Sequence, residues 1–228
     1  MAERIRIDIA PEEQVTALLY EAARDPVGIC LVLAHGAGGN QMSGFMVKFA
    51  GALADRGIDV ATFNFLYSEQ RKRVPDRNDK LELCWSRVIE IFRGEIIPRK
   101  LGKRKLVIGG KSMGGRIASQ VAAKTPDGIA GLVFLGYPLH PPGRPEQLRS
   151  KHLPQVRAPM LFVQGAKDAF GTPEELRPIM RTLKAPTELS VVEGGDHSFK
   201  VAKSFGTPQD KVDAFVLDET ERWLRRAI

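Results

Sequence analysis

The sequence predicts an α/β protein with an open, mostly parallel sheet of about eight strands and helices on both faces. Short continuous apolar runs alternate along the chain with longer segments of helical periodicity. The apolar runs lack alternating polar residues, as expected for strands that are covered on both faces. The alternation of the two kinds of segment is typical of βαβ units, whose strands run parallel.

The first two strands are predicted as a hairpin, because residues 4–9 and 15–22 are partly β-patterned and Pro11 separates them. Six further strands are expected at residues 29–33, 60–65, 106–108, 131–135, 160–163 and 189–192. Helices are expected at residues 44–56, 80–96, 114–124, 173–183 and 208–226.

Two of these helices have recognisable start signals. Thr172 and Pro173 offer an N-cap and a proline at the first helical position, and Glu175 lies three residues after the cap. Thr207 and Pro208 repeat the first two signals. We therefore expect each Thr-Pro pair to begin a helix.

Length and composition fit one globular domain over residues 1–228, with 43% hydrophobic and 27% charged residues. No apolar run approaches the roughly 18 residues that a membrane helix needs, and charges interrupt the first eight residues where a signal peptide is apolar. The only cysteines are Cys30 and Cys84, which excludes a disulfide framework. We expect a cytoplasmic protein that does not bind membranes.

The balance of 34 Lys and Arg against 27 Asp and Glu gives a net charge of +7. Basic residues cluster at 71–73 and 99–105, and neither cluster is interleaved with aromatic residues as a base-stacking surface would be. We expect both clusters to be solvated surface, so that the protein has no nucleic-acid partner. Nucleic-acid binding by these clusters is the alternative.

The clearest chemical motif is GKSMG at residues 110–114, which fits G-x-S-x-G. An apolar strand precedes it and a helix follows, the context of a nucleophile elbow that exposes the hydroxyl of Ser112. A phosphate-binding loop would need a glycine where the chain has Lys105, so we reject that reading.

A second glycine-rich loop, His35 to Gly39, follows the first long strand. It fails as a dinucleotide fingerprint because Gln41 stands at the third glycine position. As an oxyanion loop it fits, with backbone N–H groups of Ala37 and Met113 as the two donors, each worth about 2.7–4 kcal/mol in a transition state. His35 is expected to shape the loop.

An acid and a base follow two later strands. Asp168 comes after the strand at 160–163, and His197 lies on a glycine-rich loop after the last strand. A serine hydroxyl becomes a nucleophile when an imidazole takes its proton, and a carboxylate orients that imidazole. We therefore assign Ser112, His197 and Asp168 these roles, with Asp196 as the rival acid.

The residue at the elbow separates related enzyme classes. Dehalogenases and epoxide hydrolases have Asp there and dienelactone hydrolases have Cys, whereas this chain has Ser112. Acyl transfer is therefore favoured.

Together these segments resemble the α/β-hydrolase fold over nearly the whole chain. More narrowly, five segments resemble a small dienelactone-hydrolase-like family. They are AHGAG at 34–38, GKSMGGR at 110–116, GYPLHPPG at 136–143, QG at 164–165 with Asp168, and GDHSF at 195–199. That family has bacterial members, a testis-expressed protein and a subunit of a histone-acetyltransferase complex. The resemblance implies the fold and the triad positions, and it leaves the substrate open.

The expected function is a serine hydrolase that acts on an ester, thioester or related acyl substrate without cofactor or metal. The alternative is a non-catalytic module that keeps the fold for protein contacts, as the complex subunit suggests.

The irregular stretches 66–79 and 139–157 each follow a strand, so both should emerge at the carboxyl edge of the sheet, where ligands bind. Neither is long enough for a second domain or a lid domain. Arg71 and Arg73 in the first stretch are candidates for binding an anionic substrate, against the alternative of a solvated loop.

Overall fold

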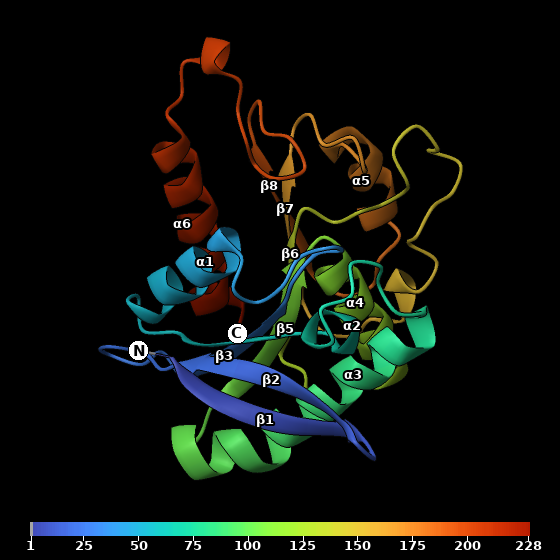
Figure 1. Ribbon diagram of the computed structural model, residues 1–228. Helices are drawn as coiled ribbons and strands as arrows, with labels where there is room; N and C mark the ends of the chain where they lie inside the picture. The colour runs from blue at the N-terminus through green and yellow to red at the C-terminus, as the bar shows by residue number, and fades with distance from the viewer. Residues whose placement is uncertain (1) are drawn as a thin grey trace.

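The structure is a computed structural model that describes residues 2–228. Its eight-stranded sheet has the order β1-β2-β4-β3-β5-β6-β7-β8 (Figure 1). The strands are β1 Glu3–Ala10, β2 Glu13–Tyr20, β3 Ile29–Ala34, β4 Asp59–Phe63, β5 Lys105–Lys111, β6 Gly131–Leu135, β7 Met160–Gly165 and β8 Thr187–Val192. The eight predicted strands are therefore all present.

Only the first part of the sheet is antiparallel. Strand β1 pairs antiparallel with β2, and β2 pairs antiparallel with β4. From β4 through β3 and β5 to β8 every pairing is parallel. The carboxyl ends of these six strands consequently meet at one edge of the sheet.

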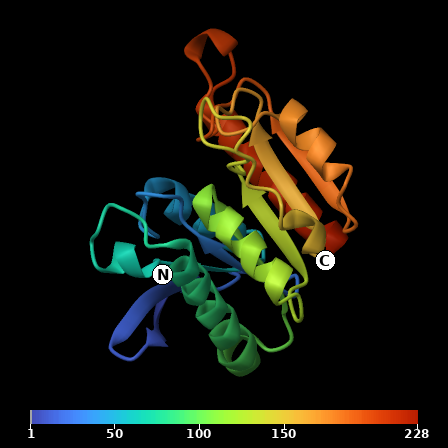
Figure 2. The same ribbon diagram turned by 90° about the vertical axis from the view of Figure 1, so that its right-hand side faces the viewer.

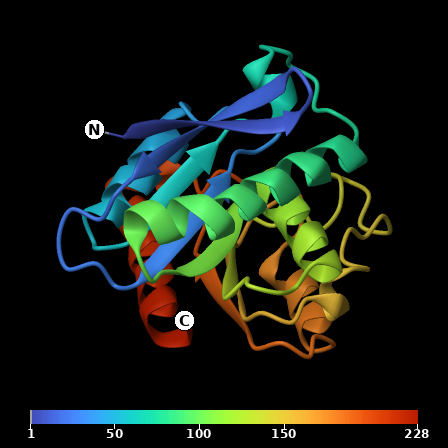
Figure 3. The same cartoon turned by 90° about the horizontal axis from the view of Figure 1, so that it is seen from below.

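Helices cover both faces of the sheet (Figures 1 to 3). They are α1 Gly44–Ala54, α2 Leu66–Glu69, α3 Asn78–Ile91, α4 Met113–Lys124, α5 Pro173–Met180 and α6 Gln209–Ala227. Short 3-10 turns lie at Leu153–Gln155 and Lys203–Phe205, and a π-helical segment spans Phe92–Leu101. No helix within residues 2–228 has the length and apolar character to cross a membrane.

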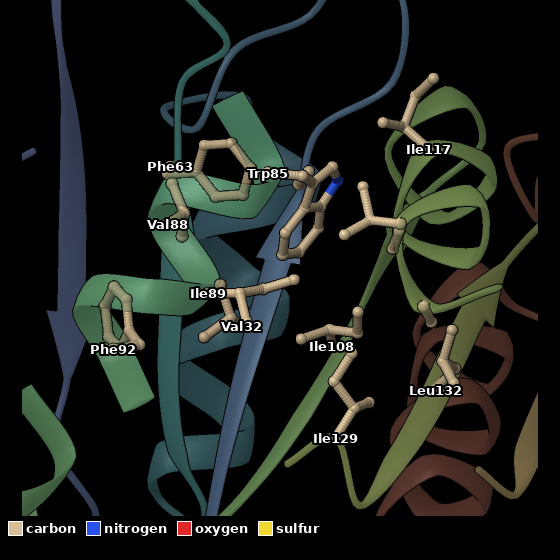
Figure 4. Packing of buried hydrophobic residues seen from close by; sticks show 14 of the residues in the cluster. Val32, Phe63, Trp85, Val88, Ile89, Phe92, Ile108, Ile117, Ile129 and Leu132 are labelled. Atoms are coloured by element: carbon tan, nitrogen blue, oxygen red, sulfur yellow. The ribbon is translucent and has the colours of Figure 1, made fainter. Parts of the chain in front are cut away.

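Each sheet face has its own apolar core. Helices α1 and α6 pack on one face through residues such as Phe49, Val216 and Trp223. Helices α3 and α4 pack on the other, where Trp85 and Ile117 are buried (Figure 4). This two-sided burial explains why the inner strands are continuously apolar.

Trp85 of α3 connects this second core to the site. Its ring meets Phe63 edge-on, with the centroids 4.7 Å apart. Its indole N–H donates to the carbonyl oxygen of Gly114 at 3.1 Å. The first turn of α4 is thereby fixed by a buried aromatic side chain.

Of the two Thr-Pro pairs, only the first begins a helix as predicted. Thr172 caps α5, and its hydroxyl accepts from the N–H of Glu175, whose carboxylate accepts from the N–H of Thr172 in return. The prediction at Thr207 and Pro208 was wrong by one residue. Pro208 has an extended backbone with φ −62° and ψ 145°, so α6 begins at Gln209 without a side-chain cap.

The helix predicted at residues 80–96 also differs. It begins at Asn78, and α-helical winding ends at Ile91, where the π-helical segment Phe92–Leu101 takes over. Pro98 lies inside that segment. Because proline has no N–H to donate, an α-helical hydrogen-bond ladder cannot pass through it unbroken.

Candidate active site

Ser112 stands at the turn between β5 and α4. Its backbone has φ 50° and ψ −117°, a conformation that costs a non-glycine residue about 1–3 kcal/mol. The turn is held by the Ser112 N–H, which donates to the Leu135 carbonyl at 3.1 Å, and by the Ser112 carbonyl, which accepts from the Arg116 N–H at 3.1 Å. The strained elbow that the motif predicts is therefore present.

The glycines of the motif are required by the neighbouring strand. A Cβ atom on Gly110, where φ is 153°, would lie 2.2 Å from the Ala34 carbonyl oxygen. A Cβ atom on Gly114 would lie 2.3 Å from the same oxygen. Only glycine lets the elbow pack this tightly on the end of β3.

The hydroxyl of Ser112 meets His197, which lies on the loop after β8. The distance from Ser112 Oγ to His197 Nε2 is 2.7 Å. On the other side of the ring, His197 Nδ1 lies 2.8 Å from Asp168 Oδ2. Three side chains that are distant in the sequence thus form one line of hydrogen bonds from hydroxyl to imidazole to carboxylate.

Asp168 is 1% exposed and follows the end of β7. Its Oδ1 atom accepts the Phe170 N–H at 2.8 Å, and its Oδ2 atom accepts from the Gln164 side-chain amide at 2.7 Å in addition to His197. Both carboxylate oxygens are therefore occupied by donors, which holds the group in the orientation that faces the imidazole.

The rival acid, Asp196, has its carboxylate turned toward its own loop. Its Oδ1 atom accepts the backbone N–H groups of Ser198 at 2.7 Å and Lys200 at 2.9 Å. This side chain shapes the turn that carries His197.

Two residues without a predicted role, Phe170 and Lys111, support His197. The ring of Phe170 stacks on the imidazole with 4.1 Å between centroids and 30° between planes. The Lys111 ammonium donates to the His197 carbonyl oxygen and lies 5.2 Å from the centroid of the Phe199 ring. Burial lowers the pKa of Lys111 to about 8, against the opposing charges of Asp168 and Asp196.

The predicted oxyanion donors line the same cavity as Ser112 and His197, a hollow of about 550 Å³. Within residues 2–228, neither the Ala37 N–H nor the Met113 N–H donates to a protein acceptor. Both groups are consequently available to a ligand.

His35 anchors the loop that carries Ala37. The ring is 1% exposed, its Nε2 atom accepts the Phe65 N–H at 3.2 Å, and its Nδ1 atom lies 2.8 Å from the Gly36 carbonyl oxygen. Burial lowers the pKa of His35 to about 4. The neutral ring therefore shapes the loop, as the sequence indicated.

A second cavity of about 480 Å³ adjoins the first beneath α1 and α6. Its walls include Phe45, Phe49 and Phe199, and it shares Ala37 and Lys111 with the cavity of Ser112. The site thus has a polar compartment and an apolar one on either side of the predicted oxyanion loop.

Arg71 and Arg73 are both exposed, and neither lines the Ser112 cavity. Two other arginines, Arg116 and Arg149, line it instead. Arg116 lies four residues after Ser112, where the sequence leaves open whether its side chain braces the elbow or faces water. No local signal marks Arg149.

A different Ser–His pair lies away from this cavity. Ser119 Oγ is 2.7 Å from His152 Nε2, and burial lowers the pKa of His152 to about 4. Ser119 is fully buried in the middle of α4 and also donates to the Arg116 carbonyl. This pair ties the 139–157 stretch to α4. In the described part of the chain, no three His, Cys, Asp or Glu side chains converge as a metal site requires.

The chain is similar to known proteins both in sequence and in structure. The sequence model of a family described as an alpha/beta hydrolase domain matches residues 27–225. A dienelactone hydrolase from Anabaena variabilis superposes with a TM-score of 0.74 at 18% identity, covering 100% of this chain and 98% of that one.

Two further structures are similar over most of their length. An alpha-beta serine hydrolase homologue from Coxiella burnetii has a TM-score of 0.73 at 18% identity, covering 95% of this chain and 96% of that one. A serine hydrolase without a lid from Xanthomonas campestris has a TM-score of 0.71 at 19% identity, with 97% and 94% covered. At such identities the likeness concerns the fold, and it confirms the fold predicted from the sequence.

Proposed function

Because this chain belongs to the alpha/beta hydrolase domain family, we propose that it is a serine hydrolase that cleaves an ester, thioester or related acyl substrate. The observation that carries the proposal is the line of hydrogen bonds from Ser112 through His197 to Asp168, at 2.7 and 2.8 Å. Nucleophile, base and orienting acid within such distances are the parts that acyl transfer needs.

In the first half of the reaction, Ser112 Oγ attacks the acyl carbon while His197 Nε2 takes the hydroxyl proton. The carbonyl oxygen becomes an oxyanion that accepts from the N–H groups of Ala37 and Met113. Collapse of this intermediate breaks the bond to the leaving group, which receives the proton from His197. The product is an acyl-enzyme on Ser112 and a free alcohol or thiol.

In the second half, water attacks the acyl-enzyme and gives a proton to His197. Collapse releases the carboxylic acid, and the proton returns to Ser112 Oγ. Asp168 remains ionised throughout, since its work is to hold the Nδ1–H tautomer and to stabilise the imidazolium. No cofactor enters either half of this scheme.

The shape of the site favours small acyl substrates. The connection between β6 and β7 carries only the short turn Leu153–Gln155, so no separate lid domain stands over Ser112 among the described residues. The apolar cavity beside Ala37 suits a short hydrocarbon part of the substrate, because Phe45, Phe49 and Phe199 line it.

We also propose that the protein works in a reducing compartment such as the cytoplasm. Cys30 and Cys84 are both free and buried. Free buried thiols are ordinary in compartments where reductants keep cysteines reduced, which supports this part of the proposal.

Covalent labelling tests the proposal directly. A fluorophosphonate probe should label the native protein, and Ser112→Ala should abolish the labelling. Ser119→Ala is a matched control, because Ser119 also contacts a histidine but is fully buried. Absence of labelling in the native protein, or labelling that persists in Ser112→Ala, would overturn the proposal and favour a non-catalytic interaction module.

A further inference from the structure

Five arginines in residues 2–228 are partly buried, and they differ in whether a carboxylate neutralises them. Arg56, Arg87 and Arg104 each form an ion pair at 3.1 Å or less. Arg116 and Arg149 form no ion pair with any carboxylate of the described chain. These two are also the arginines that line the Ser112 cavity.

Arg116 extends from the first turn of α4, four residues after Ser112. One of its terminal nitrogens donates to two amide oxygens, Asn78 Oδ1 at 3.2 Å and Gln120 Oε1 at 3.3 Å. A guanidinium has five N–H donors, so these neutral contacts leave most of the fork free. The side chain is thereby oriented without being neutralised.

Arg149 belongs to the 139–157 stretch, but its backbone is fixed. Its N–H donates to the Leu139 carbonyl at 2.7 Å, and its carbonyl accepts from the Tyr137 hydroxyl at 2.9 Å. Tyr137 is 1% exposed. A buried tyrosine and the backbone of the same loop therefore hold Arg149 at the rim of the cavity.

The charges around the two guanidinium groups do not cancel. Asp76 also lines the cavity, and its Oδ2 atom accepts the Tyr67 N–H at 2.9 Å. Glu82 acts on Arg116 from α3 but is itself paired with Lys124. Burial lowers the pKa of the Arg116 guanidinium, and the charge of Arg149 acts in the same direction. The cavity wall thus carries one carboxylate and three basic side chains, the third being Lys111. The Lys111 ammonium already donates to the His197 carbonyl oxygen, which leaves the two guanidinium groups as the cations free to bind a ligand.

We infer that Arg116 and Arg149 form an anion-binding subsite and that the preferred substrates are esters with a carboxylate close to the scissile bond. This inference rests on the proposed function, because it names the substrate class of the same site. A substrate carboxylate supplies the charged acceptor that neither guanidinium has within the described chain, and the planar fork matches it in shape.

The test compares two esters that differ by one charge. They are the mono-4-nitrophenyl ester of glutaric acid and the same molecule with its free carboxyl group methylated. The readout is the ratio of kcat/KM for the anionic ester to kcat/KM for the neutral one. The ratio cancels changes in folding or in Ser112 reactivity, since these affect both esters alike.

The native protein should prefer the anionic ester. Arg116→Gln and Arg149→Gln should each lower the ratio by about 10- to 100-fold, as expected for loss of a hydrogen bond between charged groups. Arg116→Lys should retain part of the preference because it retains the charge. Arg144→Gln is the control on the same loop: Arg144 is exposed and does not line the cavity, so the ratio should stay as in the native protein.

The outcomes separate this inference from the proposed function. Hydrolysis of both esters that depends on Ser112, with ratios unchanged in Arg116→Gln and Arg149→Gln, would overturn the subsite and leave the hydrolase standing. If the ratio fell in Arg71→Gln or Arg73→Gln but not in Arg116→Gln and Arg149→Gln, the anion would bind at the loop predicted from the sequence, and the inference would be wrong. No hydrolysis of either ester, with no labelling of Ser112, would overturn both.

Discussion

The side-chain amide of Gln164 donates, at 2.7 Å, to the same Asp168 oxygen that accepts from His197. Gln164 is fully buried in β7, and the same amide nitrogen donates to the Gly171 carbonyl at 2.7 Å. Its amide oxygen accepts the Tyr137 N–H at 2.8 Å. One glutamine therefore connects the ends of β6 and β7 to the acid of the candidate triad.

Replacing Gln164 with Leu should reduce kcat by about tenfold while KM changes less than twofold, because Asp168 loses a donor that orients it without touching substrate. The unfolding free energy should also fall by about 2 kcal/mol, since the Tyr137 N–H and the Gly171 carbonyl lose their partner. Steady-state kinetics and urea unfolding measure the two effects. Gln155→Leu, at an exposed glutamine, is the control. A native kcat in Gln164→Leu would refute the positioning role.

The strained backbone of Ser112 predicts an unusual order of stability. With φ at 50°, both Ser and Ala at this position carry the strain, whereas Gly does not. Ser112→Gly should therefore be more stable than Ser112→Ala by about 1 kcal/mol, the strain relieved minus the greater entropy of glycine in the unfolded chain. Thermal unfolding of the two inactive variants measures the difference. An Ala variant as stable as the Gly variant would show that the elbow stores no strain.

Local sequence signals predicted the parts of this site that the backbone itself dictates. The G-x-S-x-G spacing predicts the elbow because only glycine tolerates the approach of Ala34 to positions 110 and 114. Strand ends predicted where Asp168 and His197 emerge, since parallel strands end at one edge.

Other parts depend on contacts between distant segments and left no local signal. Arg149 reaches the cavity because Leu139 and Tyr137 hold its backbone. The exposed positions of Arg71 and Arg73 depend on how the stretch after β4 folds, including the unpredicted helix α2. Gln164 was visible as a polar residue at the end of an apolar strand, but its partners were not.

The buried ring of His35 should make the protein less stable in acid. Its folded-state pKa of about 4 lies below the ordinary value of 6.5, so the neutral ring contributes its full stability above pH 6.5. That contribution is lost as the pH falls through 6.5 toward 4, and it amounts to about 3 kcal/mol. Unfolding free energies measured from pH 7.5 to 4 should decline less steeply in His35→Gln than in the native protein. The difference in slope should correspond to at most one proton taken up on unfolding. Parallel curves for the variant and the native protein would contradict the assignment.

Deprotonation of Lys111 should make kcat fall at alkaline pH, which gives the pH–rate profile an alkaline limb. Its ammonium donates to the His197 carbonyl, and it gives up a proton as the pH rises through about 8. A hydrogen bond from a charged donor exceeds that from a neutral amine by about 1 kcal/mol, so kcat should fall about fivefold across this range. Lys111→Met should have a lower kcat and no alkaline limb near pH 8. Lys200→Met, at an exposed lysine on the loop of His197, should keep the native profile. If the limb persisted in Lys111→Met, another group would be responsible for it.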